Sequence, residues 1–315
     1  MKAKFLILFS ILVTTIIYAQ EKTYTPSEVD IKTNLASIKG TLLTPTTIKK
    51  PNLVILIPGS GPTDRDGNNV MMKNNSVKYL SESLSKNKIA TYRYDKSVLS
   101  LTQKDTTKIK NLTFNTFIEE AIEVIQYFKN SNKYNKIVVA GHSQGSLVGI
   151  IASKNNADGF ISLEGAGRPI DEILIEQIEK QAPYLKEETA KVLSELKKGN
   201  TVEKFNPILI SLFNKTVQPF LISWIKYNPQ NEIKKLAIPI LIIQGTKDIQ
   251  VSMEDAQLLY KANDKSKLQL IENMNHLFKE IKGDINENMA SYSNPDLPVT
   301  PKLTASILNF INKIN

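Results

Sequence analysis

Cysteine is absent from this sequence of 315 residues, and histidine occurs only twice, as His142 and His276. A chain without cysteine forms no disulfide, offers no thiolate nucleophile and builds no thiolate metal site. Two histidines and scattered carboxylates also support no metal site, and we expect none. The remaining chemistry must come from hydroxyl, carboxylate and imidazole groups.

Signatures of nucleic-acid binding are also absent. The net charge is +9, but the lysines are scattered along the chain and no helix-turn-helix, zinc or RNA-binding pattern accompanies them. We therefore interpret the charge as a solvated basic surface and expect no nucleic-acid partner. Hydrophobic residues make up 41% of the chain, which is enough for a sizeable core.

The N-terminus carries a three-part targeting pattern. Lys2 and Lys4 precede an apolar or hydroxylated run, Phe5–Ile17, and a small residue follows at Ala19. This pattern predicts a signal peptide over residues 1–19 and a mature chain that begins at Gln20 in the periplasm or outside the cell. An uncleaved anchor is the alternative, although the run is short for a spanning helix. We expect no stable membrane span in the mature chain.

The mature sequence alternates strand-like and helix-like segments. Residues 27–45 alternate apolar and polar side chains and predict an early antiparallel pair. Continuous apolar runs that end in Gly, Asp or Asn predict buried parallel strands, and they lie near residues 52–61, 89–95, 136–141, 159–165, 239–245 and 267–273. Helical periodicity lies between them, as in residues 113–130. The pattern predicts an α/β fold with a mostly parallel sheet flanked by helices.

One region interrupts this alternation. No strand pattern lies between about residues 168 and 236, where residues 169–200 and 207–229 both predict helix. We interpret the region as a helical cap inserted into a domain that spans residues 20–315. The second segment is apolar nearly all round and contains the single tryptophan, Trp224. We expect its Leu, Ile, Phe and Trp side chains to roof a pocket.

A serine stands between two glycines where a buried strand should turn into a helix. Ser143 lies between Gly141 and Gly145, in the pattern Gly-His-Ser-Gln-Gly. In a sharp strand-to-helix elbow, side chains at the glycine positions would collide and the serine hydroxyl would be exposed. The pattern predicts a nucleophile, and an ordinary glycine-bracketed turn is the alternative.

A serine nucleophile needs a base and an acid that orients the base. His142 is held in the elbow beside Ser143, so His276, in a loop after a strand, is the candidate base. Asp248 follows Ser143 by 105 residues and precedes His276 by 28, in a turn after an apolar strand. This chain order of serine, acid and histidine is that of α/β-hydrolases. Glu164 also ends a strand and is the rival acid.

A tetrahedral oxyanion needs two hydrogen-bond donors. The backbone N–H of Gln144 follows the nucleophile, and we expect the second donor at Ser60, after the Pro58–Gly59 corner. The loop that contains Ser60 lacks the patterns of phosphate-binding and dinucleotide-binding loops. We therefore predict no cofactor.

Together these residues resemble the α/β-hydrolase superfamily, and more narrowly bacterial carboxylesterases with four motifs. The motifs are a Gly-Ser-Gly-Pro-x-Asp-Arg-Asp-Gly-Asn loop at residues 59–68, the elbow at 141–145, an acid turn at 244–251 and a Met-Asn-His base motif at 274–276. The resemblance covers nearly the whole mature chain. It implies an α/β-hydrolase fold and a serine esterase with a helical cap and no cofactor, with Ser143, Asp248 and His276 as the triad.

Two details of this resemblance concern the loop at residues 59–68, which we call the oxyanion loop, and the turn that we expect beside it. Many relatives follow Arg-Tyr-Asp with an Arg-Gly-x-Gly-x-Ser turn, whereas here Asp95 is followed by Lys-Ser-Val-Leu-Ser. This departure bears on the local shape of the pocket. Asp64, Arg65 and Asp66 are expected to form an ion-pair network that shapes the loop, and a direct role in substrate binding is the alternative.

We expect hydrolysis of small esters with short to medium acyl chains through an acyl-enzyme. A thioesterase, peptidase or acyltransferase would use the same triad, and a non-catalytic binding protein on this scaffold is the alternative of another class. The oligomeric state does not follow from the sequence.

Overall fold

The computed structural model describes residues 23–33, 35–101 and 104–314. The predicted signal peptide, residues 1–19, and its expected cleavage point before Gln20 lie outside the described residues. All of the described residues belong to the predicted mature chain.

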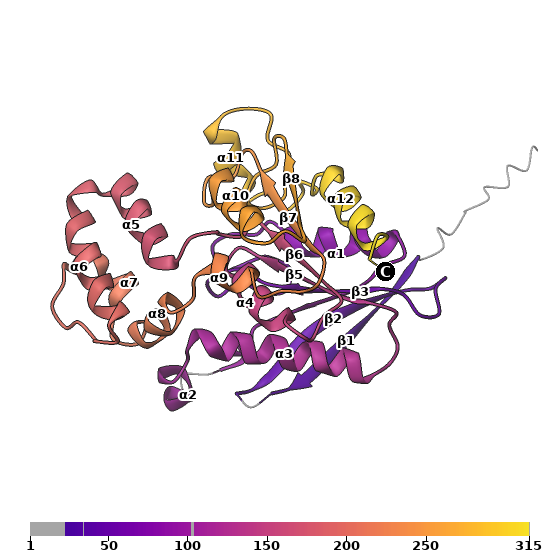
Figure 1. The fold of residues 1–315 in the computed structure, drawn as a ribbon, viewed down its shortest axis with the longest axis horizontal. Helices are drawn as coiled ribbons and strands as arrows, with labels where there is room; N and C mark the ends of the chain where they lie inside the picture. The colour runs from indigo at the N-terminus through magenta and orange to yellow at the C-terminus, as the bar shows by residue number, and fades with distance from the viewer. Residues whose placement is uncertain (1–22, 34, 102–103, 315) are drawn as a thin grey trace, which may run out of the picture.

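The centre of the fold is a sheet of eight strands in the order β1-β2-β4-β3-β5-β6-β7-β8 (Figure 1). β1 pairs with β2 and β2 with β4 in antiparallel register, and every other pairing is parallel. The strands are β1 (Tyr24–Lys32), β2 (Ser37–Pro45), β3 (Leu53–Ile57), β4 (Ala90–Tyr94), β5 (Ile137–His142), β6 (Gly159–Leu163), β7 (Ile240–Gly245) and β8 (Ser266–Ile271). The predictions of an early antiparallel pair and a mostly parallel sheet are confirmed.

Helices cover both faces of the sheet. The α-helices are α1 (Ser76–Lys86), α2 (Thr106–Lys110), α3 (Phe114–Asn130), α4 (Gln144–Ser153), α5 (Ile170–Gln181), α6 (Lys186–Lys197), α7 (Ile210–Phe213), α8 (Gln218–Ile225), α9 (Pro229–Ile233), α10 (Met253–Ala262), α11 (Ile285–Ser291) and α12 (Pro301–Ile311). Short 3₁₀ helices lie at Ser97–Ser100, Pro183–Leu185 and Pro207–Leu209.

The continuous apolar runs are explained by this two-sided cover. In β3, Leu53 and Ile55 pack into the cluster formed with α3, α4 and α10. The alternate residues Val54 and Leu56 pack into the cluster formed with α1 and α12 on the other face. A parallel strand buried on both faces needs apolar side chains at every position.

Helices also fill the chain between β6 and β7. α5, α6, α7 and α8 share an apolar cluster of their own, which includes Leu193, Leu196, Phe213 and Leu221. Figure 1 shows these helices grouped beside the sheet rather than stacked on its faces. In the described part of the chain, no single helix has both the length and the apolar composition to cross a membrane. One pair bent by 63°, Pro207–Phe213 with Gln218–Ile225, meets those criteria together.

The expected helix over residues 207–229 is not continuous. It divides into a 3₁₀ turn, α7, α8 and α9, with a break at residues 214–217. Asn214 Oδ1 accepts hydrogen bonds from the backbone N–H groups of Thr216 and Val217. A side chain that bonds its own following backbone in this way favours a turn over a helix. Pro219 then lies in the first turn of α8, where its missing N–H costs little.

Candidate active site

The parallel strands end at a common edge of the sheet. The loops that follow β3, β5, β6, β7 and β8 therefore meet there, and they carry Ser60, Ser143, Glu164, Asp248 and His276, respectively. Ligand sites of open α/β sheets form at this carboxyl edge. The topology thus collects residues that are far apart in the sequence.

Ser143 lies at a strained corner between β5 and α4. Its φ of 53° and ψ of −122° are rare for a residue with a side chain. A Cβ at Gly141 would lie 2.1 Å from the carbonyl oxygen of Gly145, and one at Gly145 would lie 2.6 Å from the carbonyl oxygen of Ile57. The close approach of these backbones explains the glycine at both positions.

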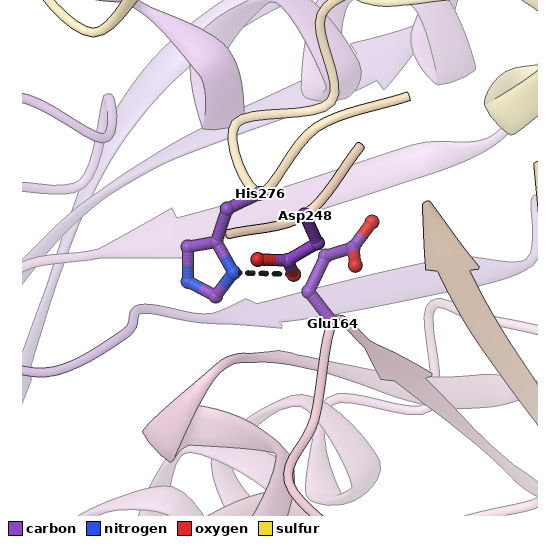
Figure 2. Close-up of side chains that lie close together, drawn as sticks. All are labelled: Glu164, Asp248 and His276. Atoms are coloured by element: carbon purple, nitrogen blue, oxygen red, sulfur yellow. Dashed lines mark hydrogen bonds and ion pairs between the residues drawn. The ribbon is translucent and has the colours of Figure 1, made fainter. Parts of the chain in front are cut away.

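His276 and Asp248 form a buried hydrogen-bonded pair. The Nδ1 of His276 lies 2.7 Å from Oδ2 of Asp248, and their side chains are 4% and 0% exposed (Figure 2). An ionised carboxylate only accepts, so His276 Nδ1–H donates and its Nε2 is left as a base. Ser143 and His276 line the same pocket. No hydrogen bond joins their side chains, and such bonds are often long until substrate binds.

Asp248 is held as a carboxylate by its other contacts. Oδ1 accepts hydrogen bonds from the backbone N–H groups of Gln250 at 2.7 Å and Val251 at 3.0 Å. Oδ2 also accepts one from Gln244 Nε2 at 3.0 Å. Burial alone would raise the pKa of Asp248, but the charge and hydrogen bond of His276, with the hydrogen bonds from Glu164 and the backbone of Gln250, hold it well below its usual range. The group therefore stays ionised at neutral pH.

Glu164, the rival acid, lies against Asp248 rather than in its place (Figure 2). Its side chain is fully buried, and both of its oxygens lie within hydrogen-bond reach of Gly245 N–H, at 3.0 and 3.1 Å. Burial, then the charge of Asp248, raise the pKa of Glu164 well above its usual range. A protonated Glu164 donates a hydrogen bond to Asp248. In this geometry the carboxylate that contacts His276 belongs to Asp248.

The same three side chains are the group within the described chain that could hold a metal ion. Ligand atoms of Glu164, Asp248 and His276 lie within 4.8 Å of one another. However, the Nδ1 that faces the carboxylates carries a proton in the hydrogen bond to Asp248, and a protonated nitrogen cannot ligate a metal. The donor set therefore fits a hydrogen-bonded triad better than a metal centre.

The contacts and the pKa of His142 do not suit it to act as the base. Its Nε2–H donates to the backbone oxygen of His276 at 2.9 Å, and its ring packs on Phe278 with centroids 4.8 Å apart. Burial, then the neighbouring His276 ring, lower the pKa of His142 to about 3. A neutral imidazole of such low basicity supports the loop of His276 and does not accept a proton at neutral pH.

The two expected oxyanion donors lie in segments that adjoin Ser143. Gln144 begins α4, so its backbone N–H is one of those a helix leaves without an internal partner. Ser60 lines both pockets that reach Ser143. On either side of Ser60, the carbonyl oxygens of Gly59 and Gly61 accept hydrogen bonds from Lys96 Nζ, at 2.8 and 3.0 Å.

Ion pairs brace the loop that follows Ser60, as expected from its charges. Arg65 pairs with Asp95 at 2.8 Å, and Asp66 pairs with Arg93 at 2.7 Å. Asp64 accepts hydrogen bonds from the backbone N–H groups of Asp66 and Asn68 instead of pairing with a cation. The ion pairs therefore form with residues outside the Asp64–Asp66 segment. They join the loop to Arg93 in β4 and to Asp95, the residue that follows that strand.

A mainly apolar pocket of about 310 Å³, which Arg168 and Gln177 also line, extends from Ser143 towards the helical insertion. Its lining includes Leu147 from α4 and Ile170, Ile173 and Leu174 from α5. The expectation that residues 207–225 roof the pocket is wrong in its main part, because Trp224 alone among them reaches it. Their other large side chains pack within the insertion, as Phe213 does, or against α3, as Phe220 does.

Sequence reasoning missed the supporting residues of the site. The side chain of Lys96 is buried and its Nζ contacts the oxyanion loop, and the only signal was that the residues after Asp95 depart from the turn of the carboxylesterases that the sequence resembles. Gln244, which contacts Asp248, is an ordinary strand residue in the sequence. Tyr292 lines a pocket with Ser143 although it lies 149 residues away in the chain. No pattern could have found it.

This strand order, with a serine elbow after β5, defines the α/β-hydrolase fold. No family model matches the chain. Esterase EstD of Thermotoga maritima is 29% identical over 239 residues, which cover 71% of this chain and 54% of the relative. The chain thus spans about half the length of the curated relative it matches.

Solved structures agree on the fold. Est1E from Butyrivibrio proteoclasticus superposes with a TM-score of 0.58 at 17% identity, over 91% of this chain and 99% of the other. The Pyrococcus furiosus esterase Pf2001 gives 0.55 at 15% identity, over 92% of both chains. The α/β hydrolase GrgF from Penicillium gives 0.59 at 14%, over 92% and 99%. The predicted fold class is confirmed.

Proposed function

We propose that the chain is a serine hydrolase of carboxylic esters, with Ser143 as nucleophile, His276 as base and Asp248 as acid. The observation that carries the proposal is the buried Asp248–His276 hydrogen bond in a pocket shared with the strained Ser143. The likeness to a protein named an esterase supports ester over amide hydrolysis.

The proposed reaction has two halves. His276 Nε2 takes the proton of Ser143 Oγ as the oxygen attacks the acyl carbon, and the backbone N–H groups of Ser60 and Gln144 bind the oxyanion. The C–O bond then breaks, its electron pair stays with the departing oxygen, and His276 gives that oxygen the proton. Water repeats the steps on the acyl-enzyme and releases the acid. Asp248 stays ionised and stabilises the imidazolium.

The apolar pocket supports an acyl group of short to medium length. Leu147, Ile173 and Trp224 give it hydrophobic walls, and each buried methylene contributes about 0.8 kcal/mol to binding. A cavity of about 310 Å³ has room for roughly twenty water-sized groups at about 10–15 Å³ each, so a short to medium acyl chain fits entirely within it. We propose acetyl to hexanoyl esters as preferred substrates.

We further propose that the protein works in the periplasm or outside the cell. The support is the charged, apolar and small-residue pattern of residues 1–19. Fractionation of the producing cell and N-terminal sequencing of the exported protein test this, with Gln20 expected as the first residue. Retention of Met1 on a membrane-bound product would contradict it.

The nucleophile is tested by labelling with a fluorophosphonate reagent and by mass mapping of the labelled peptide. We expect the label on Ser143, and we expect Ser143→Ala to lower kcat by about 10⁶. Ser146→Ala is a poor control because that hydroxyl is buried and bonded to Ser162. Ser60→Ala is the better control, because Ser60 is exposed and its proposed role uses only its backbone N–H. Ser143 should still be labelled in this variant. A label on Ser60 would overturn the assignment.

The substrate class is tested by kcat/KM for aryl esters of rising acyl length, beside a thioester and a peptide amide. We expect an optimum between acetyl and hexanoyl esters. An optimum at long chains would indicate a lipase, and faster turnover of the amide or thioester would indicate a peptidase or thioesterase. Failure of every substrate together with an unlabelled Ser143 would leave the non-catalytic alternative.

A further inference from the structure

Two pockets with different linings meet at Ser143. Ser60, Ser143 and Gln250 line both of them. One is the apolar pocket of about 310 Å³ already described, and the other has a volume of about 150 Å³. We call the smaller one the polar pocket, because Thr63, Asn69, Asn74, Ser76 and Tyr292 line it and not the larger one, although Pro58, Met72, Val77 and Leu277 add apolar surface.

The polar pocket is rich in hydrogen-bonding groups but holds no fixed charge. Its lining has no Asp, Glu, Lys or Arg among the described residues. Burial, opposed by the hydrogen bond from Gln250, raises the pKa of Tyr292 to about 12, so its hydroxyl keeps its proton. An anion would find no lysine or arginine there, and a cation would find no carboxylate. The lining therefore suits a neutral, hydroxyl-bearing group.

Several of these groups have hydrogen-bonding capacity that the protein does not use. Ser76 is 1% exposed, and its Oγ has no partner among the described residues. Asn69 Oδ1 accepts from two backbone N–H groups, which leaves its amide N–H groups without a partner in the described chain. Tyr292 Oη accepts from Gln250 Nε2 at 3.0 Å, and its own proton finds no acceptor there. Ser76 is the buried group among them, and a ligand hydroxyl that bonds it would offset the free-energy cost of burying a polar group without a partner.

The position of His276 decides which half of an ester enters which pocket. The departing oxygen must lie within reach of the histidine that protonates it. His276 lines the polar pocket and does not line the apolar one. The alcohol half of the ester therefore points into the polar pocket, and the acyl half into the apolar pocket.

The size of the polar pocket limits the alcohol. One water-sized group needs about 10–15 Å³ of such a cavity, so about 150 Å³ holds roughly ten. That is room for one small polyol or one monosaccharide ring. A polymer chain fits only if the pocket's open side lets it leave.

We propose that the polar pocket is the leaving-alcohol subsite and that it selects a compact, uncharged polyhydroxy alcohol, a polyol or a single sugar ring. This inference rests on the proposed ester hydrolysis at Ser143. The reaction is the ester hydrolysis proposed for Ser143. The ester C–O bond breaks, and the sugar or polyol oxygen keeps the electron pair and takes the proton from His276.

The test compares butanoyl esters that share the acyl group and differ in the alcohol. The probes are monobutanoyl glycerol, a monobutanoyl hexose, ethyl butanoate, cyclohexyl butanoate and butanoylcholine. We expect kcat/KM for the hexose or glycerol ester to exceed that for the cyclohexyl and choline esters by at least tenfold. A preference for the cyclohexyl or choline ester would overturn the inference, while hydrolysis with a labelled Ser143 would leave the proposed function standing.

Variants separate recognition from leaving-group reactivity, which differs between alcohols. Ser76→Ala and Tyr292→Phe should each lower the ratio of kcat/KM for the hexose ester to that for the cyclohexyl ester by about 2- to 10-fold, the effect of one lost neutral hydrogen bond. Ser83→Ala on the same helix, whose hydroxyl bonds Thr304 outside the pocket, is the matched control and should leave the ratio unchanged. An unchanged ratio in both pocket variants would contradict the subsite. Loss of all turnover and of labelling in the wild type would instead contradict the proposed function itself.

Discussion

Replacing Lys96 by methionine tests how the oxyanion loop is held. The ammonium is buried, its Nζ donates to the carbonyl oxygens of Gly59 and Gly61, and it lies 4.9 Å from the centre of the Phe117 ring. These two carbonyl groups bracket Ser60, whose backbone N–H is a proposed oxyanion donor. Methionine keeps most of the side-chain volume and removes both hydrogen bonds.

We call the two hydrogen bonds from Lys96 Nζ to Gly59 and Gly61 the Lys96 clamp. The expected loss of kcat follows from its contact with the residues on either side of Ser60. Removing an oxyanion donor outright costs about 10²–10³ in kcat. Lys96 acts through the loop rather than on the oxyanion, so we expect Lys96→Met to lower kcat about 10- to 100-fold with little change in KM. The measurement is steady-state kinetics with a short-chain aryl ester.

The pH dependence gives a second readout. Burial, partly offset by the charge of Glu120, lowers the pKa of Lys96 to about 8. The wild-type kcat should therefore fall as pH rises through 8, because a neutral amine is a weaker donor, and Lys96→Met should lack this decline. Stability moves the other way. The unfolded lysine, with a pKa near 10.5, binds more protons than the folded one between pH 8 and 10.5, so unfolding free energy rises across that window. Between pH 8 and 10.5, the unfolding free energy of the wild type should rise by about 3 kcal/mol more than that of Lys96→Met.

Lys279 supplies a matched control. Burial also lowers its pKa to about 8, but its Nζ donates to the backbone oxygen of Leu297 and lies 4.9 Å from the centre of the Tyr79 ring, apart from the oxyanion loop. Lys279→Met should affect stability without the loss of kcat. Equal kcat losses in both variants, or a Lys96→Met enzyme with wild-type kcat and pH profile, would refute the clamp.

Three further outcomes follow from the site. Asp248→Asn should lower kcat by about 10⁴, whereas Glu164→Gln, which keeps a donor beside Asp248, should lower kcat far less. Steady-state kinetics of the two variants test this, and the reverse order would assign the acid to Glu164 at the end of β6. His276→Asn should abolish turnover while His142→Asn retains measurable activity, and the opposite result in the same assay would exchange their roles. Gly141→Ala should lower both the melting temperature and activity, because its Cβ would lie 2.1 Å from a carbonyl oxygen; an unchanged melt would mean that the elbow can relax.

Much of the fold could be predicted because its signals are local. The apolar runs at β3 and β7 are continuous because parallel strands are covered on both faces, and the helix at Phe114–Asn130 has clear periodicity. The glycines around Ser143 mark a turn that only small residues permit. Local propensity failed over residues 207–229, where Asn214 bonds the following backbone and breaks a segment whose composition favours one helix.

The sequence by itself determined the candidate residues of the site, because two histidines and one serine in a Gly-x-Ser-x-Gly pattern leave few choices. Their order along the chain could not say which carboxylate contacts the histidine. Only the tertiary structure puts Asp248 beside His276 and turns Glu164 into its protonated neighbour, since burial of two carboxyl groups together disfavours a second charge. Likewise, no local pattern links Lys96, Ser76 and Tyr292 to Ser143. These residues meet because parallel strands end at one edge, and contacts across that edge depend on the packing of the whole sheet.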